Sequence, residues 1–132
     1  MEQISVQTSR RTELLDITGR VSEVVSRSGV ENAICTVFVP HTTAAVTINE
    51  NADPDVPYDI LKVVDSLIPF EAGYSHSEGN SAAHIKSSLV GASIQVVVEG
   101  GRMRLGTWQG IYFAEFDGPR NRKAWVAFSQ LV

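Results

Sequence analysis

The last third of this 132-residue chain is a series of short extended segments separated by tight turns, and this order restricts the fold more than any other feature. Gly100-Gly101 is a pair suited to a two-residue hairpin turn, which needs positive φ angles. A second turn is indicated by Asp117-Gly118-Pro119-Arg120-Asn121. The strands expected around these turns are residues 94–99, 102–105, 107–116 and 123–130. The C-terminal third is therefore expected to be sheet.

Helical spacing of apolar residues appears only before this region. Thr18 is expected to cap a helix that Gly29 stops, and Asp53-Pro54 is a strong helix start. The expected helices are residues 18–28, 53–69 and 80–89, and the expected strands are residues 3–8, 12–17, 33–39 and 43–48. In the second helix the apolar stripe is Val56, Ile60, Val63, Val64 and Leu67. This order predicts a single α+β domain, residues 1–132, with a mostly antiparallel sheet and about three helices.

The segment from Leu105 to Asp117 shows which side chains share a face. Period-two alternation places Trp108, Tyr112, Ala114 and Phe116 on one face, which we expect to be core. The opposite face carries Thr107, Gln109, Glu115 and Asp117. Gln109 and Glu115 are roughly 20 Å apart along a strand, at about 3.3 Å per residue. Without a bulge at Gly110 they cannot share one small site within a subunit.

Composition excludes several classes of protein. Hydrophobic residues make up 43% of the chain, yet the longest apolar runs have only the length of a strand, so we expect no membrane partner. The net charge of −4 argues against non-specific nucleic-acid binding. The first residues lack the pattern of a signal peptide, and Cys35 lies in an apolar run where a buried, inert thiol is expected. A cytoplasmic protein is the default expectation.

Charge is unevenly distributed along the chain. Residues 1–98 carry six Lys or Arg against twelve Asp or Glu, whereas residues 99–132 carry five against three. The acidic residues are densest from Glu50 to Glu78. A fold that joined the two regions could hold a cation beside an anion. A solvated acidic helix and a separate basic turn explain the same pattern equally well.

The three histidines, His41, His76 and His84, each lie beside turn residues and suggest one shared site. His41 follows a strand end and precedes Thr42 and Thr43. Imidazole is both the commonest ligand for a transition metal and the side chain that titrates nearest physiological pH. No H-x-x-x-H or C-x-x-C spacing is present, so only the fold could assemble a metal site. The alternative for His41 is a ring whose polar atoms are satisfied by the backbone of a turn.

Groups suited to an anion lie near the second and third histidines and in the last turn. Asn80 or Ser81 opens a helix whose free amides could bind phosphate or carboxylate. Arg120 projects from the turn after Asp117, with Arg122 two residues later, and the rigid guanidinium fork suits the same ligands. The alternative is a surface Asp117–Arg120 pair that only stabilises the turn.

Several stretches in the same order resemble the YjbQ-like proteins, for which secondary thiamine-phosphate synthase activity has been described. These stretches are His41-Thr42-Thr43-Ala44-Ala45, Glu50-Asn51-Ala52-Asp53-Pro54, Tyr74-Ser75-His76 with Glu78-Gly79-Asn80, Ala83-His84-Ile85-Lys86, Leu105-Gly106-Thr107-Trp108-Gln109-Gly110 and Glu115-Phe116-Asp117-Gly118-Pro119-Arg120. The resemblance covers nearly the whole chain. It implies an α+β homotrimer with a polar pocket near a subunit interface, built around His41, His76 and His84, with zinc as a candidate ligand.

The reaction that the resemblance implies joins hydroxymethylpyrimidine diphosphate to thiazole phosphate and releases pyrophosphate, with carboxylates available for Mg²⁺. Two other functions fit the residues: a zinc-dependent hydrolase or lyase with Glu78 or Glu115 as base, and a non-enzymatic trimer that binds an anionic metabolite. The candidate catalytic groups are His41, His76, His84, Glu78 and Glu115, and the three histidines are also the candidate metal ligands. The candidate groups for a small anionic or phosphorylated substrate are Thr42, Thr43, Asn80, Gln109, Asp117, Arg120 and Arg122.

Overall fold

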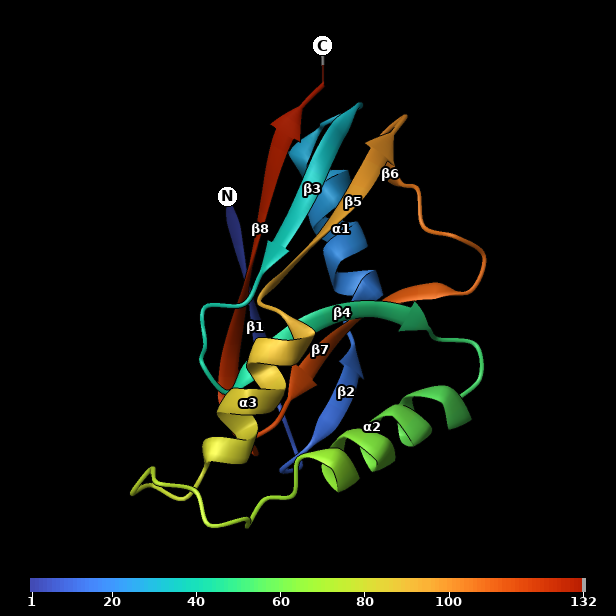
Figure 1. Ribbon diagram of the computed structural model, residues 1–132. Coiled ribbons are helices and arrows are strands. Elements are labelled where there is room, and N and C mark those ends of the chain that lie inside the picture. Colours follow the sequence, from blue (N-terminus) through green and yellow to red (C-terminus); the bar gives the residue numbers. More distant parts are fainter. Residues whose placement is uncertain (132) are drawn as a thin grey trace.

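The computed structural model describes residues 1–131 and contains eight strands and three helices (Figure 1). The strands are β1 (Glu2–Gln7), β2 (Glu13–Asp16), β3 (Ala33–Phe38), β4 (Ala44–Glu50), β5 (Ser93–Glu99), β6 (Arg102–Met103), β7 (Gln109–Glu115) and β8 (Asn121–Gln130). The helices are α1 (Thr18–Ser28), α2 (Asp55–Leu67) and α3 (Ser81–Val90). The predicted single α+β domain with antiparallel pairing and three helices is confirmed.

The strands form two sheets. The larger has the order β1-β8-β3-β5-β6 and the smaller β2-β7-β4, and all pairs are antiparallel. β7 and β8 are consecutive in the chain but belong to different sheets, so the turn between them carries the chain from one sheet to the other. By contrast, β5 and β6 form the expected hairpin, in which Gly100 and Gly101 have φ angles of 60° and 78°.

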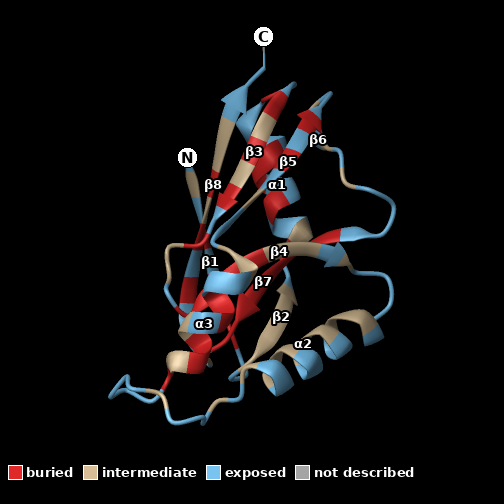
Figure 2. Ribbon diagram, viewed as in Figure 1, coloured by how far each residue is buried: buried red, intermediate tan, exposed pale blue. Residues whose placement is uncertain are grey.

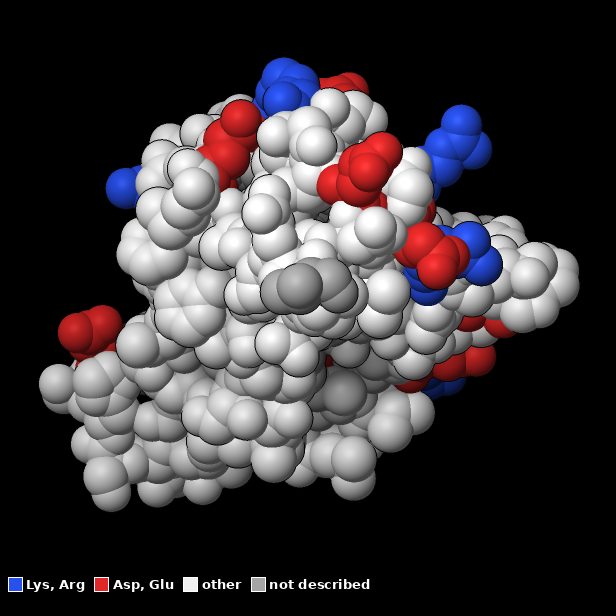
Figure 3. All heavy atoms as spheres, turned by 90° about the horizontal axis from the view of Figure 1, so that it is seen from above, with Lys and Arg blue, Asp and Glu red and all other residues white. Residues whose placement is uncertain are grey.

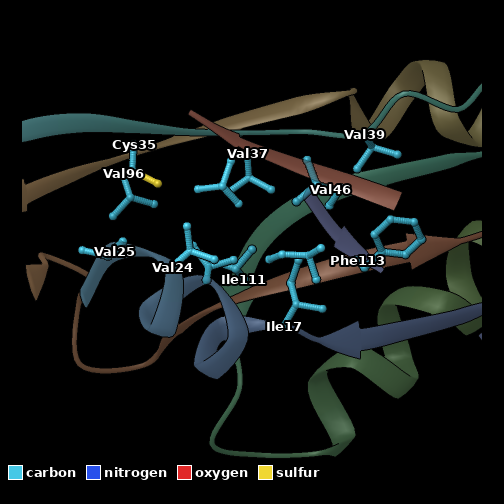
Figure 4. Packing of buried hydrophobic residues seen from close by; sticks show 14 of the residues in the cluster. Ile17, Val24, Val25, Cys35, Val37, Val39, Val46, Val96, Ile111 and Phe113 are labelled. Carbon is cyan, nitrogen blue, oxygen red and sulfur yellow. The ribbon is translucent and has the colours of Figure 1, made fainter. Parts of the chain in front are cut away.

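The main core lies between the inner face of the larger sheet, α1 and the smaller sheet (Figure 4). Cys35 and Val37 of β3 face Val24 of α1, and Ile111 and Phe113 of β7 close the other side. Burial raises the pKa of the Cys35 thiol to about 11, which keeps it protonated at neutral pH.

A second, smaller cluster lies between the smaller sheet and α3. Its members are Ala45, Ala83, Ala114 and Phe116. β7 is therefore buried on both faces from Gly110 onward, as the colouring of Figure 2 shows. The prediction that Trp108 belongs to the core is wrong: it precedes the strand and its side chain is 61% exposed.

Two helix starts differ from expectation. Thr18 is the first residue of α1 and makes no cap; its hydroxyl donates to Asp16 Oδ1 and accepts from the amide of Ile111 in β7. Asp53 precedes α2 by two residues, and its carboxylate accepts a hydrogen bond from the free amide of Asp55, as predicted.

The apolar stripe predicted along α2 is only partly buried in the structure. No residue of this helix is fully buried (Figure 2). Among residues 1–131, none of the helices has the length and apolar character needed to cross a membrane.

Candidate functional site

Three segments distant in sequence converge on an open pocket of about 710 Å³. They are the connection from β3 to β4, the start of α3 with the loop before it, and the turn from β7 into β8 (Figure 1). The sequence-predicted site residues in its wall are His41, Thr42, Thr43, His76, Glu78, Asn80, His84, Asp117, Arg120 and Arg122. Glu115 lies behind this wall, bonded to Arg122, and Gln109 lies at the far end of β7.

His41 is tied to the neighbouring strand by its ring. Nε2 accepts a hydrogen bond from the backbone N–H of Lys123 in β8, at 2.9 Å. Burial lowers the pKa of His41, and the positive charges of Arg122 and Lys123 lower it further. The ring is therefore neutral at pH 7, and because Nε2 is an acceptor, its proton is on Nδ1. His41 offers a ligand an N–H donor.

His76 and His84 lie together at the α3 end of the pocket. Their rings are perpendicular, with centroids 5.4 Å apart. His76 Nε2 is 3.9 Å from Glu78 Oε2, an exposed carboxylate. The segment is a turn and not an extended strand, since the amide of Gly79 donates to the carbonyl of His76. This turn brings the two imidazoles and one carboxylate to the same side of the pocket.

A buried ion pair forms the floor of the site. Arg122 Nε donates to Glu115 Oε1 at 2.8 Å and Nη2 to Oε2 at 2.5 Å, while Nη2 also donates to Thr43 Oγ1. Burial raises the pKa of Glu115, but hydrogen bonds from Arg122, the Asp117 amide and Thr8 outweigh it, so the net pKa is lowered. Glu115 is thus held ionised and fully bonded, which suits a structural anchor better than a catalytic base. Within residues 1–131 nothing accepts a hydrogen bond from Arg122 Nη1.

The turn after β7 is held by its own polar side chains. Asp117 Oδ2 accepts hydrogen bonds from Asn80 Nδ2 at 2.8 Å and from Arg120 Nη2 at 3.0 Å. The guanidinium of Arg120 is half exposed, so it both pairs with Asp117 and lines the pocket. Gly118 allows this turn to approach the connection from β1 to β2, because a Cβ atom there would lie 2.2 Å from the carbonyl oxygen of Arg10.

Sequence reasoning missed one polar residue that supports the site and overestimated another. Thr8, just after β1, donates to Glu115 Oε1 at 2.8 Å and accepts from the amide of Arg120. It is 107 residues from Glu115, and no local signal marks it. Gln109 instead folds back on its own turn, where its side chain accepts the amide of Gly106. β4 and β7 pair without a bulge at Gly110, so Gln109 and Glu115 stay at opposite ends of the strand.

The three histidines do not fit a zinc site as they are arranged. Among residues 1–131, no three His, Cys, Asp or Glu side chains are grouped so that they could hold a metal ion. A metal ligand must present an unprotonated lone pair, and the only one on neutral His41 is already used by the Lys123 amide. The donor set instead suits hydrogen bonding to a ligand.

Comparison with known proteins identifies the family of this chain. The family described as UPF0047 protein YjbQ-like matches residues 2–130. UPF0047 protein MJ1081 of Methanocaldococcus jannaschii is 53% identical over 121 residues, which cover 92% of this chain and 88% of that protein. UPF0047 protein YugU of Bacillus subtilis is 50% identical over 127 residues, covering 96% of each chain.

A solved structure extends the agreement to three dimensions. An uncharacterized conserved protein of the YjbQ/UPF0047 family from Clostridium acetobutylicum superposes with a TM-score of 0.96 at 53% identity, covering 98% of this chain and all of that one. The match spans both sheets and every segment that lines the pocket. This chain belongs to the UPF0047 YjbQ-like family.

Proposed function

We propose that the pocket binds a small phosphorylated molecule and catalyses a transfer in which diphosphate leaves, of the thiamine-phosphate synthase type. The observation that carries this proposal is the bonding of Arg122. Glu115 fixes the guanidinium through Nε and Nη2, Arg122 lines the pocket, and among residues 1–131 no atom accepts a hydrogen bond from Nη1. A preorganised cation with free N–H groups suits phosphate oxygens.

The chemistry requires groups that stabilise negative charge on a leaving group. In this reaction the bond between the pyrimidine methylene carbon and the diphosphate oxygen breaks, and the electron pair leaves with the diphosphate. The thiazole ring nitrogen supplies the new C–N bond. Arg120 and Arg122 would bind the departing oxygens, and the Nδ1–H of His41 would donate to them. His76 or His84, when protonated, would act as general acid.

A divalent cation would enter together with the diphosphate. Mg²⁺ prefers oxygen ligands and is commonly bound through one or two carboxylates and substrate phosphates. The carboxylate of Glu78 is mostly exposed and lines the pocket, and among residues 1–131 its nearest charged partner is His76, at 3.9 Å. Glu78 is therefore the side chain in the pocket wall best placed to share such an ion.

We also propose that the protein is a homotrimer, associating through the outer face of the larger sheet. Phe38 stacks on Trp125 there with ring centroids 5.7 Å apart, and Val97 is 49% exposed on the same face. Seen from the end that carries the C-terminus, charged side chains lie mostly in one half of the surface (Figure 3). Phe38 also lines the pocket, so a second copy on this face would lie beside the site.

The proposed assembly is tested by the molar mass from light scattering. Val97→Glu is expected to convert trimer to monomer, because it places a charge in the apolar contact. Val63→Glu, at an equally exposed position of α2, is the control. A wild-type monomer, or equal behaviour of the two variants, would remove the larger sheet as the interface.

The activity is tested by incubating the purified protein with hydroxymethylpyrimidine diphosphate, thiazole phosphate and Mg²⁺. Pyrophosphate and thiamine phosphate are expected in equal amounts. His84→Gln and Arg120→Gln should each reduce kcat/KM by about 100-fold, the usual loss for a general acid or an oxyanion contact. Arg104→Gln, whose partner is the exposed Glu99, is the matched control. No pyrophosphate release, or equal activity in all variants, would refute the assigned reaction.

A further inference from the structure

One face of α3 lines two adjoining hollows. Asn80, His84 and Ser87 are spaced by four and three residues, so they lie on one stripe of the helix. Asn80 and His84 line the pocket described above, and His84 and Ser87 line a second hollow of about 470 Å³. His41 and Ala92 belong to both walls, so the two hollows meet between the imidazoles of His41 and His84.

The same stripe holds the unsatisfied polar atoms of the fold. Within residues 1–131, the buried side-chain polar atoms that lack a hydrogen-bond partner are Oδ1 of Asn80 and Oγ of Ser87. Both residues are 8% exposed. A buried polar atom without a partner is costly and is rare in folded proteins, so a bound molecule is a reasonable source of the missing partner.

The two hollows differ in charge. The first has Arg120, Arg122, Asp117 and Glu78 in its wall. The second has no Asp, Glu, Lys or Arg among its lining residues, and its polar side chains are hydroxyls and the two shared imidazoles. One end of the combined site therefore suits an anion, and the other suits an uncharged group that forms hydrogen bonds.

We infer that the ligand is an elongated phosphate ester that lies along α3, with its phosphate at Arg120 and Arg122 and an uncharged polar group against Ser87. This inference rests on the proposed function and adds the shape and the second end of the substrate. Ser87 lies seven positions after Asn80, which is roughly 10 Å along the helix axis at about 1.5 Å per residue. The bond that reacts would then lie between His41 and His84.

The test compares a short anion with an elongated ligand, using calorimetric titration of the full-length protein with inorganic pyrophosphate and with thiamine phosphate. Ser87→Ala removes the hydroxyl, and Ala92→Leu narrows the junction from an exposed position. Each is expected to weaken thiamine phosphate binding by about tenfold, the usual loss for one buried hydrogen bond or a steric block, and to leave pyrophosphate affinity unchanged. Ser66→Ala, on the exposed side of α2, is the control and should alter neither affinity.

The outcomes separate this inference from the proposed function. If both ligands bind and Ser87→Ala and Ala92→Leu weaken only thiamine phosphate, the elongated ligand is supported. If both ligands bind but these variants act equally on both or on neither, the second hollow is not part of the site. If pyrophosphate binds and thiamine phosphate does not, the second hollow is likewise not part of the site. If neither ligand binds, the proposed phosphate site fails, and this inference fails with it.

Discussion

Glu115 and Arg122 join the two sheets through a two-point ion pair whose side chains are 0% and 6% exposed. Glu115 ends β7 in the smaller sheet, and Arg122 lies in β8 of the larger one. The pair is bonded further to Thr8 and Thr43, so one buried network holds the residue after β1, the β3–β4 connection and the last turn together. The same network presents Arg122 to the pocket, so stability and ligand binding depend on the same contacts.

Replacing Glu115 by Gln should destabilise the fold strongly. The variant leaves the buried guanidinium of Arg122 without its counter-ion, and loss of one partner of a buried pair costs about 3–5 kcal/mol. The free energy of unfolding in urea measures the change. Glu99→Gln breaks the exposed pair with Arg104 and should change it by less than about 1 kcal/mol. Similar effects of the two variants would contradict the structural role given to Glu115.

The local features of the fold could be predicted from sequence because each depends on neighbouring residues. Gly29, with φ of 76°, ends α1, and the Gly100-Gly101 turn joins β5 to β6 as expected. The division into two sheets could not be predicted, because alternation shows which residues share a face but not which strands pair. Trp108 was misplaced because the expected strand, residues 107–116, begins too early: Trp108 lies in the turn before β7, where alternation does not assign a face.

The histidines, arginines and Asn80 of the site could be selected by chemistry and by their motif order, but their bonding could not. Whether His41 would present a lone pair or an N–H depends on the amide of Lys123, 82 residues away. The sequence does not show the partner of Glu115 either. An acidic residue at the end of a strand can be a catalytic base or a structural anchor, and the two are not distinguished by sequence. Only the tertiary contacts distinguish these roles.

Gly118→Ala should destabilise the protein by about 2 kcal/mol, a typical cost of overpacking. Its Cβ atom would lie 2.2 Å from the carbonyl oxygen of Arg10 and 2.8 Å from Glu115 Cγ, so the backbone must move. Gly19→Ala is a control with the opposite expected sign, because its Cβ would meet nothing within 4 Å and alanine favours α1 by about 0.5–1 kcal/mol. Thermal unfolding of the two variants measures both effects. A Gly118→Ala protein as stable as wild type would contradict the close approach of the turn.

The free energy of unfolding should decrease as the pH falls, and His41 should account for part of this decrease. Burial and the charges of Arg122 and Lys123 hold its pKa below the unfolded value of about 6.5. The unfolded chain therefore binds this proton more readily, so the stabilising contribution is present above about pH 6.5 and is lost as the pH falls below it. His41→Gln does not titrate in this range. Urea unfolding at several values between pH 5 and pH 7.5 should show a smaller loss in the variant, whereas equal slopes would contradict the assignment.

Asp65 should be needed to stabilise a buried lysine. Lys86 on α3 is 2% exposed, and its ammonium group donates to Asp65 Oδ1 on α2 at 2.5 Å. Asp65→Asn leaves this cation without a counter-ion, and we expect a loss of about 2 kcal/mol because water can reach the half-exposed partner. Asp59→Asn, exposed on the same helix, is the matched control. Adding Lys86→Met to Asp65→Asn should recover most of the lost stability. If stability is not recovered, the loss comes from a change within α2 and not from the broken Asp65–Lys86 pair.

Purified protein should contain well under one zinc per chain by elemental analysis. The neutral ring of His41 has one lone pair, at Nε2, and the Lys123 amide occupies it. Binding zinc through His41 would require breaking that bond, and His76 and His84 alone leave the ion short of the usual three or four protein ligands. His41→Ala should therefore leave the metal content unchanged.

The opposite result would have a definite meaning for the chemistry. About one zinc per chain, lost on His41→Ala, would require the ring of His41 to turn away from Lys123 and join His76 and His84. The pocket would then hold a metal with an open position for water, and Glu78, 3.9 Å from His76, would be the nearest base for a hydrolytic reaction. Metal content thus separates the diphosphate transferase from the zinc hydrolase before either substrate is known, because the two functions require different partners for the Nε2 lone pair of His41: the Lys123 amide in the first and the metal in the second.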